Sequence, residues 1–158
     1  MIVYHGSSME ILSPDIYHSR ANVDFGKGFY VTPIKEQAVK WATRFKRDRG
    51  EGIVTVYRFD MEQCKSDYKV IEFDGYTEEW LNFITSCRKS EDVSDYDVVI
   101  GGVANDKVFN TIELYFDGLI EKYEAIKRLR YEKPNLQICI RNQQIINDFL
   151  GYEESEAV

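Results

Sequence analysis

The stretch Val23–Thr32, with the sequence VDFGKGFYVT, decides the fold of this chain. Gly26 and Gly28 flank Lys27, so the backbone of this turn can take a positive φ or approach a ligand closely. The residues after the turn, FYVT, predict a strand, and Pro33 then opens a helix. The stretch therefore predicts a glycine turn, a strand and a helix in immediate succession.

Two aromatic residues, Tyr30 on this strand and Trp41 on this helix, are candidates for holding a flat ring. The inner face of the helix is predicted from apolar residues at i, i+3, i+4 and i+7, which are Ala38, Trp41, Ala42 and Phe45. The same two rings can equally be ordinary core. The pattern of this segment alone leaves both interpretations open.

The composition describes an ordinary acidic globular chain. It has 158 residues, 44% hydrophobic and 30% charged, with a formal net charge of −7. This length fits one domain with a real core. An acidic chain repels phosphate backbones on average, which argues against a general nucleic-acid binder.

The cysteines and the chain start point to a reducing compartment. Cys64, Cys87 and Cys139 are scattered, there is no C-x-x-C and there are two histidines, so we expect no metal site and no disulfide framework. The start MIVYHGSS shows no secretory leader. No apolar stretch approaches ~20 residues, so we expect a cytoplasmic protein that does not span a membrane.

Strands and helices are predicted to be intermixed. The alternation of residues 53–59 is the strongest strand pattern, and further strands are predicted at 2–5, 68–73, 96–100 and 136–140. Helices are predicted at 33–48, 77–87, 105–117, 121–131 and 142–150. Without regular βαβ spacing, this order predicts an α+β fold. We expect one domain over residues 1–152 and a loose acidic tail at 153–158.

The N-terminal residues His5 and Gly6 are the next candidates. A histidine at the end of a strand can present its imidazole to a cleft, and a following glycine lets a planar group reach the backbone. A plain strand end is the alternative interpretation. The polar connection over residues 15–24 has no period, and long loops of this kind are often functional.

Taken together, these motifs resemble a known fold. His5-Gly6-Ser7, then FGKGFY at 25–30, then Trp41 eleven positions after Tyr30, are similar to the ADP-ribosyltransferase fold in its diphtheria-toxin and poly(ADP-ribose) polymerase branch. That branch looks like His-Gly-Ser, Phe-Gly-Lys-Gly-Ile-Tyr and a second stacking aromatic. The match covers the first third of the chain and one late strand. An uncharacterised bacterial family looks similar over most of the length, including Val103-Ala104-Asn105-Asp106.

The resemblance implies a split β-sheet core with flanking helices and a site for NAD as substrate. His5 would bond a ribose hydroxyl on the adenosine side, and the Gly6 backbone would clamp the nicotinamide carboxamide. Tyr30 and Trp41 would sandwich the nicotinamide ring, where a pyridinium gains a cation–π contribution. Ser7 and Gly28 belong to the same implied NAD-contacting set.

The chain departs from the family pattern at two positions. Where the family's catalytic glutamate opens a late strand, this sequence has Gln137, which can bond the nicotinamide ribose but brings no charge. Where the polymerase branch has a serine for the carboxamide, this sequence has Ala38. These changes argue against polymer elongation and favour mono-transfer, NAD hydrolysis or a binding-only role.

The remaining polar candidates have alternative interpretations. Asp106 or Glu113 would supply the missing carboxylate, or Asn105-Asp106 would simply cap a helix and Glu113 face solvent. His18 would contact a cofactor or acceptor, or be a plain surface residue. Arg20 would pair with the NAD pyrophosphate, since arginine forks suit phosphate oxygens.

The sequence thus predicts an NAD-dependent mono-ADP-ribosyltransferase or NAD glycohydrolase acting on an unknown acceptor: a protein, a nucleic acid or a small molecule. A catalytically silent module that binds NAD, ADP-ribose or a protein is the alternative, and a structural domain without a nucleotide site is the third. A bacterial toxin role with an antitoxin partner is compatible with these motifs. The sequence leaves the acceptor and the oligomeric state open.

Overall fold

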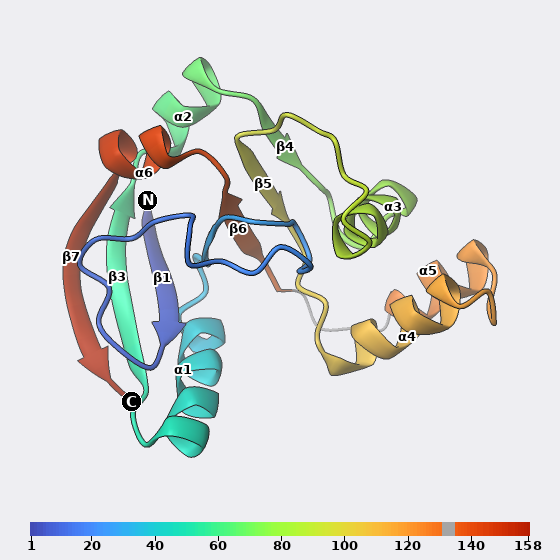
Figure 1. The fold of residues 1–158 in the computed structure, drawn as a ribbon, viewed down its shortest axis with the longest axis horizontal. Helices are drawn as coiled ribbons and strands as arrows, with labels where there is room; N and C mark the ends of the chain where they lie inside the picture. The colour runs from blue at the N-terminus through green and yellow to red at the C-terminus, as the bar shows by residue number, and fades with distance from the viewer. Residues whose placement is uncertain (131–134) are drawn as a thin grey trace.

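Two β-sheets and six helices make up the described part of the chain. The computed structural model describes residues 1–130 and 135–158 and shows a mixed α+β fold, as predicted (Figure 1). The first sheet has the strand order β1 (Ile2–Ser7), β3 (Ile53–Phe59), β7 (Leu150–Ala157). The second has the order β2 (Phe29–Val31), β6 (Gln137–Ile140), β5 (Val98–Gly101), β4 (Val70–Glu72).

The helices are distributed around these sheets. They are α1 (Lys35–Arg49), α2 (Met61–Asp67), α3 (Glu78–Arg88), α4 (Asp106–Phe116), α5 (Lys122–Leu129) and α6 (Gln143–Phe149). α1 packs on β1, whereas α3, α4 and α5 form a group beyond the second sheet (Figure 1). Side chains of Thr77, Asn105 and Asn142 accept from backbone N–H groups and so cap α3, α4 and α6.

One pair of backbone hydrogen bonds joins the two sheets. The N–H of Tyr4 donates to the carbonyl of Thr32 at 2.8 Å, and the N–H of Thr32 donates to the carbonyl of Tyr4 at 2.9 Å. This antiparallel bridge links β1 of the first sheet to the end of β2. In the part of the chain that the structure describes, the strands of the two sheets therefore pair at this bridge alone and diverge beyond it.

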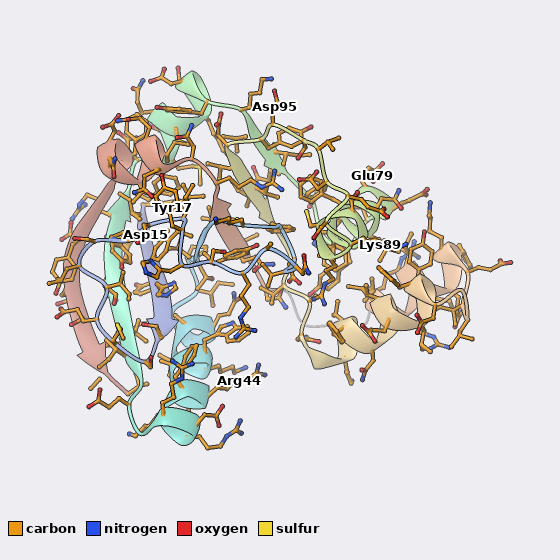
Figure 2. The ribbon with its side chains drawn as sticks, viewed as in Figure 1. Asp15, Tyr17, Arg44, Glu79, Lys89 and Asp95 are labelled. Carbon is orange, nitrogen blue, oxygen red and sulfur yellow. The ribbon has the colours of Figure 1, made fainter. Side chains whose placement is uncertain are left out.

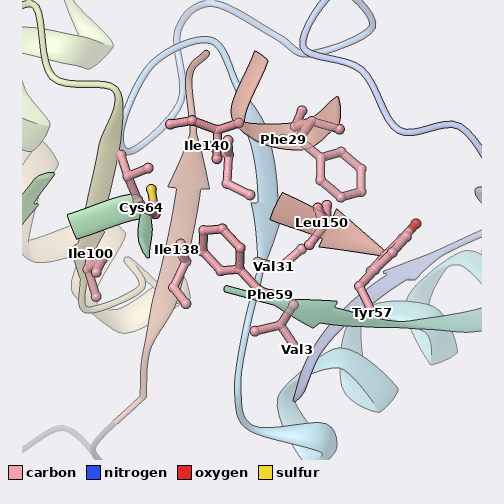
Figure 3. Close-up of a cluster of buried hydrophobic side chains, with 13 residues drawn as sticks. Val3, Phe29, Val31, Tyr57, Phe59, Cys64, Ile100, Ile138, Ile140 and Leu150 are labelled. Carbon is pink, nitrogen blue, oxygen red and sulfur yellow. The ribbon is translucent and has the colours of Figure 1, made fainter. Parts of the chain in front are cut away.

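A hydrophobic core fills the angle between the sheets. Figure 3 shows Phe29, Val31, Ile138 and Ile140 of the second sheet facing Val3, Tyr57, Phe59 and Leu150 of the first. A second cluster lies on the other face of the second sheet, where Val99 and Cys139 belong to one buried cluster with residues of α3, α4 and α5. Because both of its faces are covered, β6 is buried at every position, as the continuous apolar run 138–140 indicates.

Most predicted elements are present, with three differences. The strand at 53–59 has the predicted bounds. The helix α2 was not expected, because its seven residues have one buried apolar side chain, Cys64, and so no apolar period. The inner face of α1 is formed by Ala38 and Ala42, whereas Trp41 is 44% exposed, so its predicted inward position is wrong.

The prediction of a loose acidic tail at residues 153–158 is also wrong. Residues 153–158 belong largely to β7, which pairs along β3 from Phe59↔Leu150 to Ile53↔Ala157, with an irregularity between Val56 and Tyr57. β7 is an edge strand whose side chains are mostly exposed, so it carries no apolar alternation. Backbone pairing rather than side-chain burial holds this segment in place.

The long loop before the glycine turn lies against the first sheet. The hydroxyl of Tyr57 donates to the carbonyl of Ile11 at 2.7 Å, and the N–H of Ile16 donates to Oε1 of Gln143 at 3.1 Å. Figure 2 labels Asp15 and Tyr17 on this loop, and Oδ1 of Asp15 accepts from the backbone N–H of Tyr17 at 2.8 Å. The loop is therefore tied down at several points along its length.

Among the described residues, none of the helices combines the length and the apolar character that crossing a membrane requires.

We expect that deleting residues 153–158 lowers the free energy of unfolding by roughly 3–5 kcal/mol, because each lost interstrand hydrogen bond contributes about 1 kcal/mol. Urea denaturation followed by circular dichroism measures this loss. A full-length control, Glu153→Gln with Glu154→Gln and Glu156→Gln, removes the tail's charge but keeps the strand. The control should stay near wild type because exposed ion pairs contribute little. An unchanged midpoint after deletion would mean that β7 adds no stability.

Candidate functional site

β1 and β2 separate immediately beyond the bridge that joins them. In an antiparallel pair, the backbone groups of alternate residues point to the same side. Since Tyr4 directs both its N–H and its C=O to Thr32, Gly6 directs its own N–H and C=O to that same edge, opposite Tyr30. We call this place, bounded by His5, Gly6 and Tyr30, the strand split.

The imidazole of His5 spans the strand split. Its Nδ1 lies 2.7 Å from the carbonyl oxygen of Tyr30, and its ring stacks on Phe29 with centroids 4.6 Å apart. A carbonyl can only accept, so Nδ1 carries the proton, and in the neutral ring Nε2 is the acceptor. Burial lowers the pKa of His5, which favours this neutral form.

Gly6 is required by the close approach of α1. A Cβ at this position would lie 2.2 Å from the carbonyl oxygen of Ala38 and 2.9 Å from the backbone nitrogen of Ala42. The peptide bond between Trp41 and Ala42 therefore lies directly against Gly6. Ala38 is buried in this contact, so its methyl group serves helix packing.

The glycine turn combines a positive φ with close packing. Gly26 has a φ of 74°, as its position in the turn predicted. Gly28 lies tightly against β6, because a Cβ there would be 2.5 Å from Sγ of Cys139. The N–H of Gly28 donates to Oγ of Ser19 at 3.1 Å, which ties the turn to the preceding loop. The close approach at Gly28 is thus to the protein's own strand.

Tyr30 is anchored on the face of β2 that is covered by the second cluster. Its hydroxyl donates to the carbonyl of Gly26 at 2.5 Å and accepts from the N–H of Phe25 at 3.1 Å. Burial raises the pKa of Tyr30, so the hydroxyl stays protonated. The glycine turn and the tyrosine ring therefore hold each other in place.

Trp41 carries an exposed aromatic ring on the part of α1 that packs against Gly6. Its peptide bond to Ala42 lies against Gly6, while its ring lies 5.0 Å from the guanidinium carbon of Arg44, which is labelled on α1 in Figure 2. Small residues at 38 and 42 draw α1 too close to β1 for an indole to fit beneath the helix. The ring therefore lies beside the contact, where it remains accessible.

Gln137 opens β6 on the same face as Tyr30, because Tyr30 pairs with Cys139 two positions further on. It is 8% exposed, and its Nε2 donates to Oδ2 of Asp24 at 3.0 Å and to the carbonyl of Gly102 at 3.2 Å. His5, Tyr30 and Gln137 thus lie on three successive strands, β1, β2 and β6.

Asp24 and Arg88 are site neighbours that the sequence analysis did not identify. Oδ1 of Asp24 lies 2.5 Å from a guanidinium nitrogen of Arg88, and Oδ2 accepts from the N–H of Ala104 at 2.9 Å. Asp24 directly precedes the FGKGFY motif, which was the available signal. Its partners follow 64 and more positions later, and no local pattern links them.

The other sequence candidates lie in less constrained surroundings. Oγ of Ser7 donates to the carbonyl of Met9 at 2.5 Å, in the turn that ends β1. Arg20 is exposed on the loop next to Ser19. His18 is exposed and contacts Asp15 through Nδ1, which favours the surface interpretation.

The α4 candidates separate from the strand split. Oδ1 of Asn105 accepts from the N–H of Val108 at 3.0 Å, which confirms the capping interpretation for Asn105. The side chain of Asp106 lies outside what the structure describes. Glu113 is exposed on α4, as the solvent-facing interpretation predicted.

Two surface cavities lie outside the strand split. One of about 430 Å³ borders the glycine turn and includes Gly26, Lys27 and Arg141 in its lining. Another, of about 530 Å³, lies over Lys65 and Tyr96. Neither is lined by His5, Tyr30 or Gln137. Among the described residues, no three His, Cys, Asp or Glu side chains gather in a way that could hold a metal ion.

A family model covers almost the whole chain. Residues 1–152 match the family described as "Protein of unknown function (DUF3990)". The chain belongs to the DUF3990 family. No curated protein and no solved structure matches it. Membership in the DUF3990 family therefore assigns no activity to this chain.

We expect the stability of the protein to fall as the pH drops below about 6.5. Burial lowers the pKa of His5 in the folded protein, so the fold favours the neutral ring. The contribution of His5 to the free energy of unfolding is fully present above its pKa in the unfolded chain and is lost as the pH falls through its pKa in the folded protein. His5→Asn should lose this part of the pH dependence in thermal unfolding between about pH 5 and about pH 7. His18→Asn is the control, because His18 is exposed. Equal pH profiles for both variants would contradict the assignment to His5.

Proposed function

We propose that this protein is an NAD-dependent mono-ADP-ribosyltransferase with an ADP-ribosyltransferase-like split-sheet core. The single observation that carries the proposal is the strand split, where a neutral His5 lies beside the backbone edge of Gly6, and α1 packs its Trp41–Ala42 peptide bond against that glycine. These groups match, in order along the chain, the motif set that resembles that fold.

The polar groups at the strand split suit two ends of NAD, the nicotinamide carboxamide and a hydroxyl of the ribose on the adenosine side. A carboxamide offers one N–H₂ donor and one carbonyl acceptor, and the Gly6 edge offers the complementary C=O and N–H. The acceptor Nε2 of His5 suits a sugar hydroxyl, because Nδ1 is already held by the carbonyl of Tyr30. Both ends would thus be bound by groups whose geometry the fold fixes in advance.

The aromatic residues support the binding of a cationic ring. Trp41 begins beside Gly6, so its exposed face can cover a pyridinium held at that backbone edge. A cation over an indole gains about 0.5–2 kcal/mol, depending on how far it is desolvated. Tyr30 lies opposite Gly6 and would bound the ring on its other side.

In the proposed reaction, the bond between ribose C1′ and the nicotinamide nitrogen breaks, and nicotinamide leaves as a neutral molecule with both bonding electrons. An acceptor oxygen or nitrogen attacks C1′ and loses its proton to solvent. Developing positive charge on the sugar needs nearby acceptor groups. Gln137 offers an oxygen without a full charge, which supports single transfer or hydrolysis rather than chain elongation.

A catalytically silent binding module is the second candidate function. The observation that favours it is the charge balance next to Gln137: Asp24, the carboxylate that contacts Gln137 among the described residues, is paired with Arg88. A site without net negative charge stabilises a sugar cation less. Such a module would bind NAD or ADP-ribose and leave the glycosidic bond intact.

Nicotinamide release from NAD, measured with and without cell lysate, tests the proposal. Trp41→Ala should lower kcat/KM for NAD about tenfold, because it removes a stacking face worth about 1–2 kcal/mol. Release that requires lysate indicates a transferase, and release without lysate indicates hydrolysis or automodification. NAD binding by calorimetry without any release would favour the silent module.

Phe45→Ala is the matched control for this experiment. Phe45 lies one turn further along α1 and, like Trp41, has an arginine over its ring, Arg49 at 5.8 Å. It lies outside the strand split, so its removal should leave NAD consumption unchanged. An equal loss of NAD consumption in Trp41→Ala and Phe45→Ala would mean that these residues of α1 affect activity only by stabilising the fold. No NAD binding to wild type would overturn both candidate functions.

A further inference from the structure

The side-chain amide of Gln137 is held in one orientation by its surroundings. Its Nε2 faces two groups, Oδ2 of Asp24 at 3.0 Å and the carbonyl of Gly102 at 3.2 Å. A carbonyl and a carboxylate oxygen can only accept hydrogen bonds, so an amide N–H facing them is favoured and an amide oxygen facing them is repelled. Turning the amide over would place Oε1 against these two oxygens, and this orientation is therefore excluded.

The fixed amide leaves its oxygen toward solvent. Oε1 of Gln137 has no donor among the described residues, yet it is not among the fully buried unpaired atoms. The small exposed area of Gln137 thus includes this oxygen, on the face of the sheet that it shares with Tyr30. What Gln137 offers to a ligand at the strand split is a hydrogen-bond acceptor.

Asp24 is in turn held from two sides. Arg88, at the end of α3, contacts Oδ1 at 2.5 Å, and the N–H of Ala104 donates to Oδ2 at 2.9 Å. The guanidinium also lies 4.4 Å from the ring centre of Phe109 on α4. Asp24 therefore connects the segment before the glycine turn, α3 and the segment after β5 to the first residue of β6.

We propose that Asp24 is a positioning residue, which holds Gln137 so that Oε1 accepts a hydrogen bond from a sugar hydroxyl at the strand split. This inference rests on the proposed function, because it needs a sugar as ligand. In this arrangement, Asp24 and the carbonyl of Gly102 occupy both amide hydrogens. Gln137 then accepts a hydrogen bond from the sugar, as a glutamate would, but its own side chain is neutral. The negative charge next to it belongs to Asp24, which contacts the amide nitrogen.

The first test requires no activity. Gln137→Glu would put a second carboxylate within about 3 Å of Asp24, and two such groups cannot both ionise. The pKa of the new carboxyl group is therefore raised in the folded state. Its contribution to stability is fully present below its pKa in the unfolded chain and is lost as the pH rises through its pKa in the folded protein. Gln137→Glu should therefore lose melting temperature, relative to wild type, between about pH 4 and about pH 7. Adding Asp24→Asn should abolish this loss. A Gln137→Glu profile parallel to wild type would overturn the contact.

The second test measures nicotinamide release. Asp24→Asn removes one of the two acceptors that fix the Gln137 amide and adds a donor that can bind Oε1, so kcat should fall at least about tenfold while KM for NAD stays within about twofold. Such a split indicates a loss in the transition state, which a merely structural role would not produce in the folded fraction.

Asp92→Asn is the matched control. It breaks the ion pair of Asp92 with Arg141, at 2.6 Å, whose side chains are 17% and 12% exposed, against 12% and 18% for Asp24 and Arg88. The Asp92→Asn variant should lose about as much stability as Asp24→Asn and should keep the kcat of wild type. Equal kcat in Asp24→Asn and wild type would overturn the positioning role. Absence of release from wild type would overturn the proposed function and the role with it, while the pH profile would still decide whether Asp24 holds Gln137.

Discussion

The architecture depends on the two hydrogen bonds exchanged by Tyr4 and Thr32. They are the bridge between β1 and β2, and so between the two sheets. Because β1 and β2 pair at one residue and then separate, the N–H and C=O of Gly6 face β2 without pairing with that strand. The imidazole of His5 crosses the gap and bonds the carbonyl of Tyr30 instead. The same constraint thus joins the sheets and creates the candidate site.

Close backbone packing makes that site rigid. Gly6 lies against the carbonyl of Ala38, and Gly28 lies against β6, so neither position has room for a side chain. α1 is held directly on β1, and Trp41 is consequently displaced to the exposed side of the helix. Rigid placement of backbone donors and acceptors is the property that a site for sugar-bond cleavage uses most, because its groups need no reorganisation during the reaction.

Gln137 illustrates how the surroundings of a side-chain amide decide which of its two polar groups is held. The amide by itself could present either its donor or its acceptor. Asp24 and Gly102 take the donors, which leaves the acceptor outward. Asp24 is itself fixed by Arg88 from α3. The chemistry available at β6 therefore depends on residues from four segments of the chain.

Local order along the chain was readable from the residues alone. The alternation of Ile53–Phe59, the apolar run of β6, the Asn105 cap of α4 and the positive φ of Gly26 follow from interactions within one segment, and each was predicted. The edge strand β7 and the contact of Asp24 with Arg88 and Gln137 were not, and Trp41 was assigned to the wrong side of its helix. These features arise between segments that are distant along the chain. The periodicity of a segment indicates which of its faces is buried. It does not indicate which distant segment will contact that face, because that contact forms only when the elements pack together.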